Sequence, residues 1–367
     1  FKKMRKYNSL YQEWLNRKSL IESYSSLPVS NNVIQETTFN LLMVVLSGEE
    51  SYLADTIDSL SRQNYTAWKL TVISNNFCPD PIFDVHESLQ WVVFSAQNTL
   101  DDVIYGCIDE NSCDWTCFIE PGAVFVESAL ITVANYVNKN REWEYIYFDE
   151  GELDQNGLRC NPMFKPGFNL DLLRSLAYFG GFCFIKADTI VTFNNFSCLL
   201  GAENYDLAFK VLEKSGERAF GHIADILAYR PCKPLRYFDA EQGLKALTAH
   251  LNRENIDAVV THSEIKGGYH VNYNLMIDSK VSIIIPTKDQ LPILKACVDS
   301  IIEKTSYSDY EIIIINNQSK EIETQIYFSE IQNNKLVKIR VVDYLHPYNY
   351  AAINNFAVEQ ADGDYLV

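Results

Sequence analysis

The sequence predicts an α/β fold, in which a Rossmann-like, mostly parallel sheet has helices on both faces and is repeated along the chain. Apolar runs of strand length alternate with amphipathic helical segments, as in strand–helix–strand units. The alternation that begins near residue 41 starts again near residue 281. Because such sheets bind ligands outside the carboxyl ends of their strands, functional residues are expected in the loops that follow the strands.

The first copy contains several buried runs separated by helical segments. Its predicted strands are LLMVVL, WKLTVIS, LQWVVF, WTCFIE and YIYFDE. Helices are expected over residues 51–63, 100–110 and 127–139. In the first of these helices Leu53, Ile57 and Leu60 recur at helical spacing, which predicts one buried face.

The second copy repeats this pattern in a shorter form. Its predicted strands are VSIIIP, YEIIIIN, residues 337–342 and DYLV, with helices over residues 289–303 and 350–361. The two copies align with one inserted residue, so that Tyr65 corresponds to Tyr307. The first-copy strand at residues 114–120 corresponds to DYLV, where the sequence stops. We therefore expect the second copy to be incomplete in this sequence.

Three segments follow from this organisation: an N-terminal helical segment, a first complete domain and the first half of a second domain, over residues 1–37, 38–275 and 278–367. The N-terminal segment is basic at its start and carries Leu10, Trp14 and Leu15 on one side. This pattern is typical of a helix that packs on the next domain, and also of a membrane-surface or partner helix. Glu13 and Glu22 dilute the positive face and favour packing.

Charge and composition exclude some classes of function. The net charge is −17, whereas a nucleic-acid-binding protein presents a basic face. An anionic substrate would need a metal ion or a few cations placed near it.

The nine cysteines include no C-x-x-C pair, no run has the length of a membrane span, and no signal peptide is visible. The sequence therefore predicts a cytoplasmic location, with the inner face of the cell membrane as an alternative.

The second copy resembles a known family across about 90 residues. The run VSIIIPTKDQ…LKACVDSIIEKTSYSDYEIIIINNQS…YNYAAINNFAVEQADGDYLV resembles the first half of a family-2 glycosyltransferase catalytic domain of GT-A fold. The first copy resembles the same family more loosely, and its later part resembles the back half of tandem bacterial enzymes that build surface polysaccharides. The resemblance implies transfer of a sugar from a nucleotide-sugar donor to a glycan or lipid-linked glycan. It also implies inversion of the anomeric centre, a divalent metal such as Mn²⁺ or Mg²⁺, and contact with a membrane or a partner glycosyltransferase.

The resemblance also implies donor-binding residues in the second copy. They follow the first strand, the second strand and the last helix start, at Pro286, Thr287, Asp289, Asn316, Asn317, Asn349, Asn354 and Asn355. Family members have Asp where Asn316 stands, and its amide oxygen can accept a hydrogen bond without carrying charge. Taken singly, each of these residues is also common in ordinary turns. The metal-binding Asp-x-Asp motif is expected about three residues past Val367 if the repeat offset holds.

The first copy departs from the family at the donor side. Glu120-Pro121-Gly122 replaces Asp-x-Asp and leaves one carboxylate, a weak metal ligand. Asn204 stands at the position of the catalytic base, where Glu203 and Asp206 flank it as substitutes or as helix N-terminal charges. Retained acceptor-side candidates are Asp149, Glu150 and Lys165, and a solvated acidic loop is the alternative for the two carboxylates.

The resulting hypothesis is an enzyme whose catalysis resides in the second domain. The first domain would be a decayed or repurposed copy. The alternative is a catalytically inactive, glycosyltransferase-like domain that binds a glycan or acts as a scaffold. A third reading, in which the first copy acts without a metal through Glu120 and Glu203, has the least support.

Overall fold

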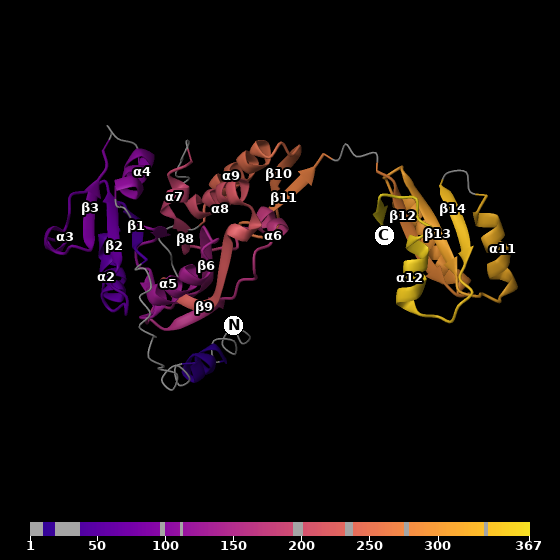
Figure 1. Ribbon diagram of the computed structural model, residues 1–367, viewed down its shortest axis with the longest axis horizontal. Helices are drawn as coiled ribbons and strands as arrows, with labels where there is room; N and C mark the ends of the chain where they lie inside the picture. The colour runs from indigo at the N-terminus through magenta and orange to yellow at the C-terminus, as the bar shows by residue number, and fades with distance from the viewer. Residues whose placement is uncertain are drawn as a thin grey trace. The chain divides into compact units, whose positions relative to one another are not determined.

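In a computed structural model, the chain divides into two compact units, Phe1–Asn274 and Leu275–Val367 (Figure 1). The structure describes residues 10–18, 37–95, 100–110, 113–193, 201–231, 238–274, 279–333 and 337–367. Each unit is built from a sheet and the helices that cover it. The predicted α/β class, with mostly parallel strands covered by helices, is confirmed.

A mixed sheet forms the centre of the first unit. Within the described residues it contains β1 (Phe39–Val45), β2 (Trp68–Ser74), β3 (Leu89–Val93), β4 (Trp115–Ile119), β5 (Val124–Phe125), β6 (Tyr145–Leu153), β7 (Arg159–Met163), β8 (Cys183–Lys186) and β9 (Phe220–Pro231). The order is β3-β2-β1-β4-β8-β6-β9-β5, and β7 pairs with β6. Strands β1 to β4 are parallel, whereas β8 runs antiparallel to both of its neighbours.

Helices connect and cover these strands. They are η1 (Glu50–Tyr52), α2 (Leu53–Ser61), α3 (Ile82–Val85), α4 (Leu100–Glu110), α5 (Ala129–Lys139), α6 (Leu170–Ser175), α7 (Ala187–Ile190), α8 (Glu203–Ser215), η2 (Glu217–Ala219) and α9 (Ala240–Arg253). A two-stranded ribbon of β10 (Ala258–His262) and β11 (Tyr269–Tyr273) follows α9.

Both faces of this sheet are buried, because alternate residues of β1 enter two separate cores. Leu41 and Met43 pack with α2 and α5, whereas Leu42 and Val44 pack with α4, α8 and α9. A strand buried on both faces is a nearly continuous apolar run, which is why LLMVVL predicts a central strand.

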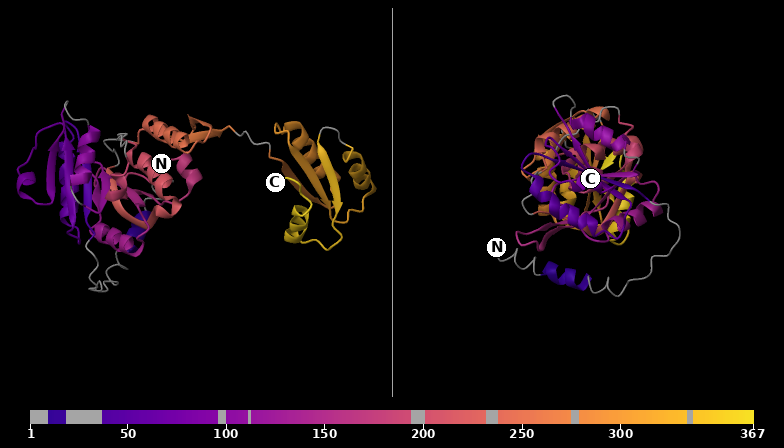
Figure 2. Two further views of the ribbon diagram at one scale, coloured as in Figure 1. Left: turned by 45° about the horizontal axis from the view of Figure 1, so that its top comes forward. Right: turned by 90° about the vertical axis from the view of Figure 1, so that its left-hand side faces the viewer.

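The N-terminal segment is described only over residues 10–18, which are helical (Figure 2, indigo). The rest of the predicted segment lies outside the described residues. Tyr11 is buried against Ile226 and Tyr229 of β9, and its hydroxyl lies 3.1 Å from that of Tyr229. Of the three residues that the sequence places on one side, Leu15 packs in this cluster, whereas Leu10 and Trp14 are exposed. The buried side of the helix therefore includes Tyr11, whose ring can be buried while its hydroxyl finds a polar partner.

The second unit is a smaller parallel sheet. Its elements are β12 (Val281–Thr287), α10 (Leu291–Lys304), β13 (Tyr310–Asn316), α11 (Ile322–Ile331), β14 (Lys338–Asp343), α12 (Tyr350–Val358) and β15 (Tyr365–Leu366), in the order β14-β13-β12-β15. Ile312 and Ile314 pack with α10 and α11, whereas Ile313 and Ile315 pack with α12 on the other face.

The two units share their strand register. Phe39 pairs with Trp68 and with Trp115, and Val281 pairs in the same way with Tyr310 and Tyr365. Position n of β1 and β2 therefore corresponds to position n + 242 of β12 and β13 (281 − 39 and 310 − 68). The internal repeat is thus a structural repeat.

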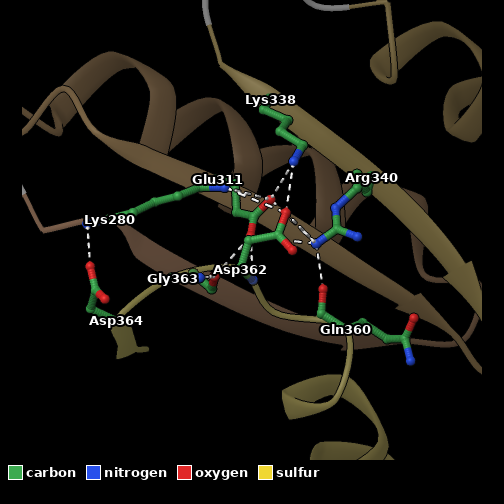
Figure 3. A network of polar contacts seen from close by, with 9 residues as sticks. Lys280, Glu311, Lys338, Arg340, Gln360, Asp362, Gly363 and Asp364 are labelled. Carbon is green, nitrogen blue, oxygen red and sulfur yellow. Dashed lines mark hydrogen bonds and ion pairs between the residues drawn. The ribbon is translucent and has the colours of Figure 1, made fainter.

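An ion network closes the amino end of the second sheet (Figure 3). The Glu311 side chain is fully buried, and its Oε2 lies 3.3–3.4 Å from the cationic nitrogens of Lys280, Lys338 and Arg340. Its Oε1 accepts hydrogen bonds from Ser282 Oγ at 2.9 Å and from the backbone N–H of Asp362 at 3.0 Å. Three strands and the turn before β15 are tied together at this end.

Some elements differ from the sequence prediction. Helix α11 has no predicted counterpart, because its apolar residues are spread around it: Ile322 and Ile326 are exposed while Tyr327 and Phe328 are buried. The strand predicted at YIYFDE continues to Leu153 as β6. Among the helices that the structure describes, none combines the length and apolar character of a bilayer-spanning helix.

Candidate functional site

The carboxyl edge of the second sheet brings most of the predicted donor residues together. Thr287 and Asn316 are paired at the ends of the neighbouring parallel strands β12 and β13. The backbone N–H of Asn317 donates to the Thr287 carbonyl at 2.8 Å, which joins the two strand-end loops. Pro286 is one residue earlier on β12. A ligand placed outside these strand ends would contact both loops.

Asp289 holds this edge in place through its carboxylate. Its Oδ1 accepts the backbone N–H groups of Lys320 at 2.8 Å and Glu321 at 2.9 Å, immediately before α11. Its own N–H donates to Ser319 Oγ at 2.8 Å. The residue has φ +50°, a conformation that Asp tolerates better than most residues. The Asp289 carboxylate thus joins the loop after β12 to the two residues that lead into α11.

The two asparagines are buried and oriented by hydrogen bonds. Asn316 Oδ1 accepts the Ser319 N–H at 2.8 Å, and its Nδ2 donates to Asp343 Oδ1 at 2.7 Å. Asn317 Nδ2 donates to the carbonyls of Tyr344 at 3.3 Å and His346 at 2.9 Å. Both asparagines therefore fix the loop after β14 as well as their own loop.

The remaining predicted donor residues lie on α12. Asn349 caps this helix, since its side chain accepts the Ala352 N–H at 3.1 Å. Asn354 donates to the Tyr350 carbonyl at 2.7 Å within the helix, and Asn355 is exposed. Within the part of the chain that the structure describes, these side chains make no hydrogen bond to the ends of β12 and β13, although α12 itself packs against both strands.

The first unit contains a cavity of about 200 Å³ at the corresponding part of its sheet. Its polar lining comes from Glu120 after β4, from Glu203 and Asn204 at the start of α8, and from Arg230 of β9. Apolar lining comes from the strands and the adjacent loops, including Leu42, Val44, Phe118, Met163, Phe179 and Phe238. This volume is below the roughly 300–1,000 Å³ typical for drug-sized ligands, so the cavity suits one sugar ring better than a whole nucleotide sugar.

A buried ion network lies behind one wall of the cavity. Lys165 Nζ is 3.1 Å from Glu150 Oε2, with both side chains 1% exposed, and it donates to the Phe179 carbonyl at 2.6 Å. Arg230 Nη2 lies 3.5 Å from Glu150 Oε1. Asp149 Oδ1 accepts from the Lys165 backbone N–H and lies 2.9 Å from His222 Nε2. Asp149 and Glu150 are thus buried within β6 and do not form the solvated loop that was one alternative.

The backbone of β6 explains how two adjacent carboxylates are buried. The ladder between β6 and β9 shifts register on each side of Asp149. Such irregularities change the direction of side chains and are common next to functional sites. The ring of Tyr147 stacks on those of Phe179 and His222, with centroids 4.2 and 4.9 Å apart. Burial raises the pKa of Tyr147, so its hydroxyl stays protonated and donates to the Pro166 carbonyl.

Gly180 forms the contact between this network and the cavity. It has φ +80°, and a Cβ built on it would lie 2.5 and 2.7 Å from the two Glu150 carboxylate oxygens. The next residue, Gly181, donates its N–H to Glu150 Oε2 at 3.1 Å and accepts from Asn204 Nδ2 at 3.1 Å. The Gly-Gly pair therefore lets the backbone lie directly on the buried carboxylate.

The three candidates around the catalytic-base position have different environments. Glu203 opens α8 and accepts the Gly201 N–H at 2.6 Å. Asp206 is buried one turn later and forms an ion pair with Lys210 at 2.6 Å, away from the cavity lining. Asn204 lines the cavity, and its buried Oδ1 has no hydrogen-bond partner among the described residues.

The residues near Glu120 do not fit a divalent metal site. Pro121 and Gly122 follow Glu120, so one carboxylate stands where two are expected. In the described part of the chain, no group of three or more His, Cys, Asp or Glu side chains is arranged to hold a metal ion. Hard cations require several oxygen ligands, usually including more than one carboxylate.

Sequence reasoning missed four residues that the structure places at these sites: Asp343, Gly180, Gly181 and Arg230. The Gly180-Gly181 pair before the buried strand β8 is the one sequence feature that could have indicated a close approach of the backbone to another group. Asp343 is 27 residues from Asn316, and only the pairing of β13 with β14 reveals that they meet.

These arrangements define an α/β protein with candidate ligand sites at the carboxyl edges of its two sheets. Residues 282–367 match the family model described as Glycosyl transferase family 2. The predicted resemblance of the second unit to this family is therefore confirmed.

The curated relatives are much longer than this chain. The O-antigen biosynthesis protein RfbC of Myxococcus xanthus is 29% identical over 344 residues, which cover 89% of this chain and 26% of the relative. The uncharacterized protein y4gI of Sinorhizobium fredii is 27% identical over 352 residues, or 89% of this chain and 38% of the relative. The chain thus spans less than two fifths of the length of either relative.

Solved structures resemble this chain more distantly. A crystal structure of S. aureus TarS 1–349 has a TM-score of 0.44 at 12% identity, covering 59% of this chain and 66% of that one. The complex of TarS 1–349 with UDP-GlcNAc has a TM-score of 0.43 at 12% identity, covering 59% and 67%.

Proposed function

We propose that the protein is a nucleotide-sugar-dependent glycosyltransferase that extends a cell-surface glycan, with the donor bound at the carboxyl edge of the second unit. The observation that supports this most strongly is the convergence of Thr287, Asp289 and Asn316 at one sheet edge, inside the segment that matches family 2. The relative named as an O-antigen biosynthesis protein supports a surface polysaccharide as the product.

The donor edge offers the kinds of contact that a nucleotide sugar requires. Polar groups at the ends of β12 and β13 can hydrogen-bond to a base. Lys288 and Lys320 are exposed in the two strand-end loops and can offset the charge of a diphosphate. Such local cations matter more in a chain with a net charge of −17.

The proposed reaction is a single inverting displacement. The bond from the anomeric carbon to the diphosphate oxygen breaks, a bond to an acceptor hydroxyl forms, and a general base takes the hydroxyl proton. A divalent cation, Mn²⁺ or Mg²⁺, stabilises the charge of a leaving diphosphate when it is bound. The acceptor in this proposal is a glycan or lipid-linked glycan at the inner face of the membrane.

A second candidate function concerns the first unit, which we propose to be a glycan-binding module without donor chemistry. Two buried polar atoms of residues that line its cavity make no hydrogen bond among the described residues: Asn204 Oδ1 and Arg230 Nε. One of them accepts hydrogen bonds and the other donates. A sugar hydroxyl does both, so neighbouring hydroxyls of one ring could pair with both atoms.

Calorimetric titration of the chain with UDP, GDP and CDP, with and without Mn²⁺, tests the donor site. We expect saturable binding of at least one nucleotide at one site per chain. Asp289→Ala should weaken it, because the two strand-end loops lose the carboxylate that joins them. Ser47 occupies the equivalent position of the first unit (289 − 242), so Ser47→Ala is the matched control and should leave binding unchanged. Absence of binding, or equal loss in both variants, would contradict the proposal.

A further inference from the structure

The helix over residues 10–18 presents apolar side chains on two sides. Tyr11 and Leu15 pack in the cluster that includes β9 and hold the helix on the first unit. Leu10 and Trp14 are four residues apart, so they are neighbours on another side, where they are 53% and 39% exposed. Figure 2 shows the helix at the periphery of this unit. Packing on the unit accounts for only one of the two apolar sides.

The exposed apolar side of the helix continues on the neighbouring strand β7. The Gln12 side chain donates to the Arg159 carbonyl, which fixes the helix against β7. The Trp14 ring meets the Phe164 ring edge-on, with centroids 6.1 Å apart and planes at 81°. Phe164 follows β7 directly and is 61% exposed. Leu10, Trp14 and Phe164 therefore form one exposed cluster, the aromatic patch, which is typical of an interaction site.

Basic side chains accompany the aromatic patch. Arg17 is three residues after Trp14 on the same side of the helix, and its side chain is 73% exposed. Its ion pair with Glu13 is also exposed, so the pair is weak and the guanidinium can change partners. The run KKMRK, at residues 2–6, adds four cations shortly before this helix in the sequence. Residues 1–18 thus carry six cations and one carboxylate, in a chain whose net charge is −17.

We propose that the aromatic patch and the basic run together dock the first unit on an anionic lipid surface. Aromatic side chains such as Trp prefer the membrane–water interface, and clusters of Lys and Arg are attracted to anionic headgroups. Either signal alone binds weakly and reversibly, whereas two signals together give stable attachment. The inference goes beyond the proposed function, since docking requires no nucleotide.

A lipid surface fits this patch better than a protein partner does. A stable protein interface buries about 800 Å² on each partner, more than three partly exposed side chains can supply. A membrane requires only shallow insertion of an apolar face, and its charge attracts each cation separately. The acidic remainder of the chain does not prevent docking, because charges more than about 8 Å apart are largely screened at physiological salt.

Co-sedimentation of the whole chain with phosphatidylcholine vesicles, prepared with and without phosphatidylglycerol, tests the proposal. We expect the chain to sediment with the anionic vesicles, to stay in solution with the neutral ones, and to be released as salt is raised. The double variant Trp14→Ala/Phe164→Ala should bind the anionic vesicles at least about tenfold more weakly, because two aromatic side chains no longer enter the interface. Replacement of the four cations of residues 2–6 by Gln should weaken binding more, by at least about a hundredfold.

Each variant has a matched control. Phe77 is 90% exposed in the loop after β2, a strand that does not adjoin β7 in the sheet, so Phe77→Ala removes an exposed aromatic ring from another part of the unit. The second control changes four exposed cations to Gln and alters the net charge equally: Lys139, Arg141, Lys214 and Arg218. Both controls should bind as the wild type does. A circular dichroism melt checks the folding of every variant, and Phe164→Ala alone, which leaves the helix unchanged, should still weaken binding at least about threefold.

Loss of binding in the patch and basic-run variants, with both controls intact, supports docking through this surface. Failure of the wild type to sediment with anionic vesicles would overturn the proposal, and so would equal binding to neutral vesicles. Binding that survives in the patch variants, or that falls equally in Phe77→Ala, would refute the aromatic patch as the docking surface. None of these outcomes depends on nucleotide binding, so the donor site can fail while docking stands, and the reverse.

Discussion

The ammonium group of Lys165 lies 3.1 Å from the carboxylate of Glu150, and both side chains are 1% exposed. A buried pair of this kind contributes little by itself, but removal of one partner leaves the other charge buried and uncompensated. Two backbone groups complete the site, since Phe179 accepts from Lys165 and Gly181 donates to Glu150. The pair therefore supports the wall of the first-unit cavity.

Replacement of one partner should destabilise the first unit strongly. We expect Glu150→Gln and Lys165→Met each to lower its free energy of unfolding by about 3–5 kcal/mol. All five tryptophans lie between residues 14 and 143, so tryptophan fluorescence during urea unfolding follows the first unit selectively. Asp58→Asn, which breaks the exposed pair with Arg62, is the control and should cost less than about 1 kcal/mol. Equal losses in the buried and exposed pairs would contradict the assignment.

Gly180→Ala should be more damaging than its φ angle alone explains. The added Cβ would meet the Glu150 carboxylate within 2.7 Å, in addition to the strain of φ +80°. Gly157 has φ +75° with open space around it, so Gly157→Ala measures the backbone strain alone, at about 1–2 kcal/mol. Fluorescence-detected urea unfolding should show a clearly larger loss for Gly180→Ala. A similar loss in both variants would show that the close approach to Glu150 has no energetic consequence.

Stability of the second unit should depend on pH through Glu311. Burial alone would raise the pKa of this carboxyl, but the Asp362 N–H, the Ser282 hydroxyl and the nearby Arg340 and Lys280 hold it below its ordinary value of 4.5. A lowered folded pKa means that the stabilisation is fully present above pH 4.5 and is lost as pH falls through the folded pKa.

Glu311→Gln should remove this pH dependence. We expect the variant to lose about 1.5–3 kcal/mol at pH 7, since its hydrogen bonds and cations lose a charged partner. Its unfolding transition should also change less than that of the wild type between pH 5 and pH 3. The second unit contains no tryptophan, so its unfolding is followed by circular dichroism and not by tryptophan fluorescence. Glu303→Gln alters an exposed residue of α10 and should behave as the wild type does. An unchanged acid response in Glu311→Gln would exclude Glu311 as its source.

Asn204→Leu should separate sugar binding from stability in the first unit. Its Oδ1 is buried without a hydrogen-bond partner among the described residues, and its Nδ2 donates to the Gly181 carbonyl, so removal of the amide should cost about as much as one hydrogen bond, roughly 0.5–1.5 kcal/mol. Affinity for a monosaccharide bound in the cavity, followed by ligand-observed NMR, should fall at least about tenfold. Asn138 makes two hydrogen bonds away from the cavity, so Asn138→Leu should lower stability and leave sugar binding intact. Sugar binding that survives in Asn204→Leu would argue against the cavity as the site.

Periodicity in the sequence predicts strands β1 to β4 and β6 of the first unit, the strands of the second unit, and helices α2, α4, α5, α10 and α12. It does not predict the later strands of the first unit, β7 to β11, or the helices between them. Ile312 to Ile315 and Leu41 to Val44 are continuous apolar runs because each strand is covered on both faces. Helix α11 is not predicted, because its exposed Ile322 and Ile326 remove the one-sided apolar pattern that indicates an amphipathic helix.

The site was only partly predictable, because its main contacts join distant segments. The ends of strands show where ligands bind, so Thr287 and Asn316 could be named from sequence. The partner of Asn316 depends on the register of β13 with β14, which no local pattern specifies. The burial of Asp149 and Glu150 depends on register shifts in β6 and on Gly180, and acidic residues next to a strand give no sign of either.

Hydrogen–deuterium exchange of the whole chain, with and without UDP or GDP and Mn²⁺, tests the central claim most directly. We predict slower exchange at the donor edge of the second unit, in peptides covering residues 286–291, 316–321 and 343–349. The equivalent loops of the first unit, at residues 44–49 and 74–79, should be unaffected. Protection confined to the first-unit loops, or no nucleotide-dependent protection in either unit, would contradict donor binding at the second sheet.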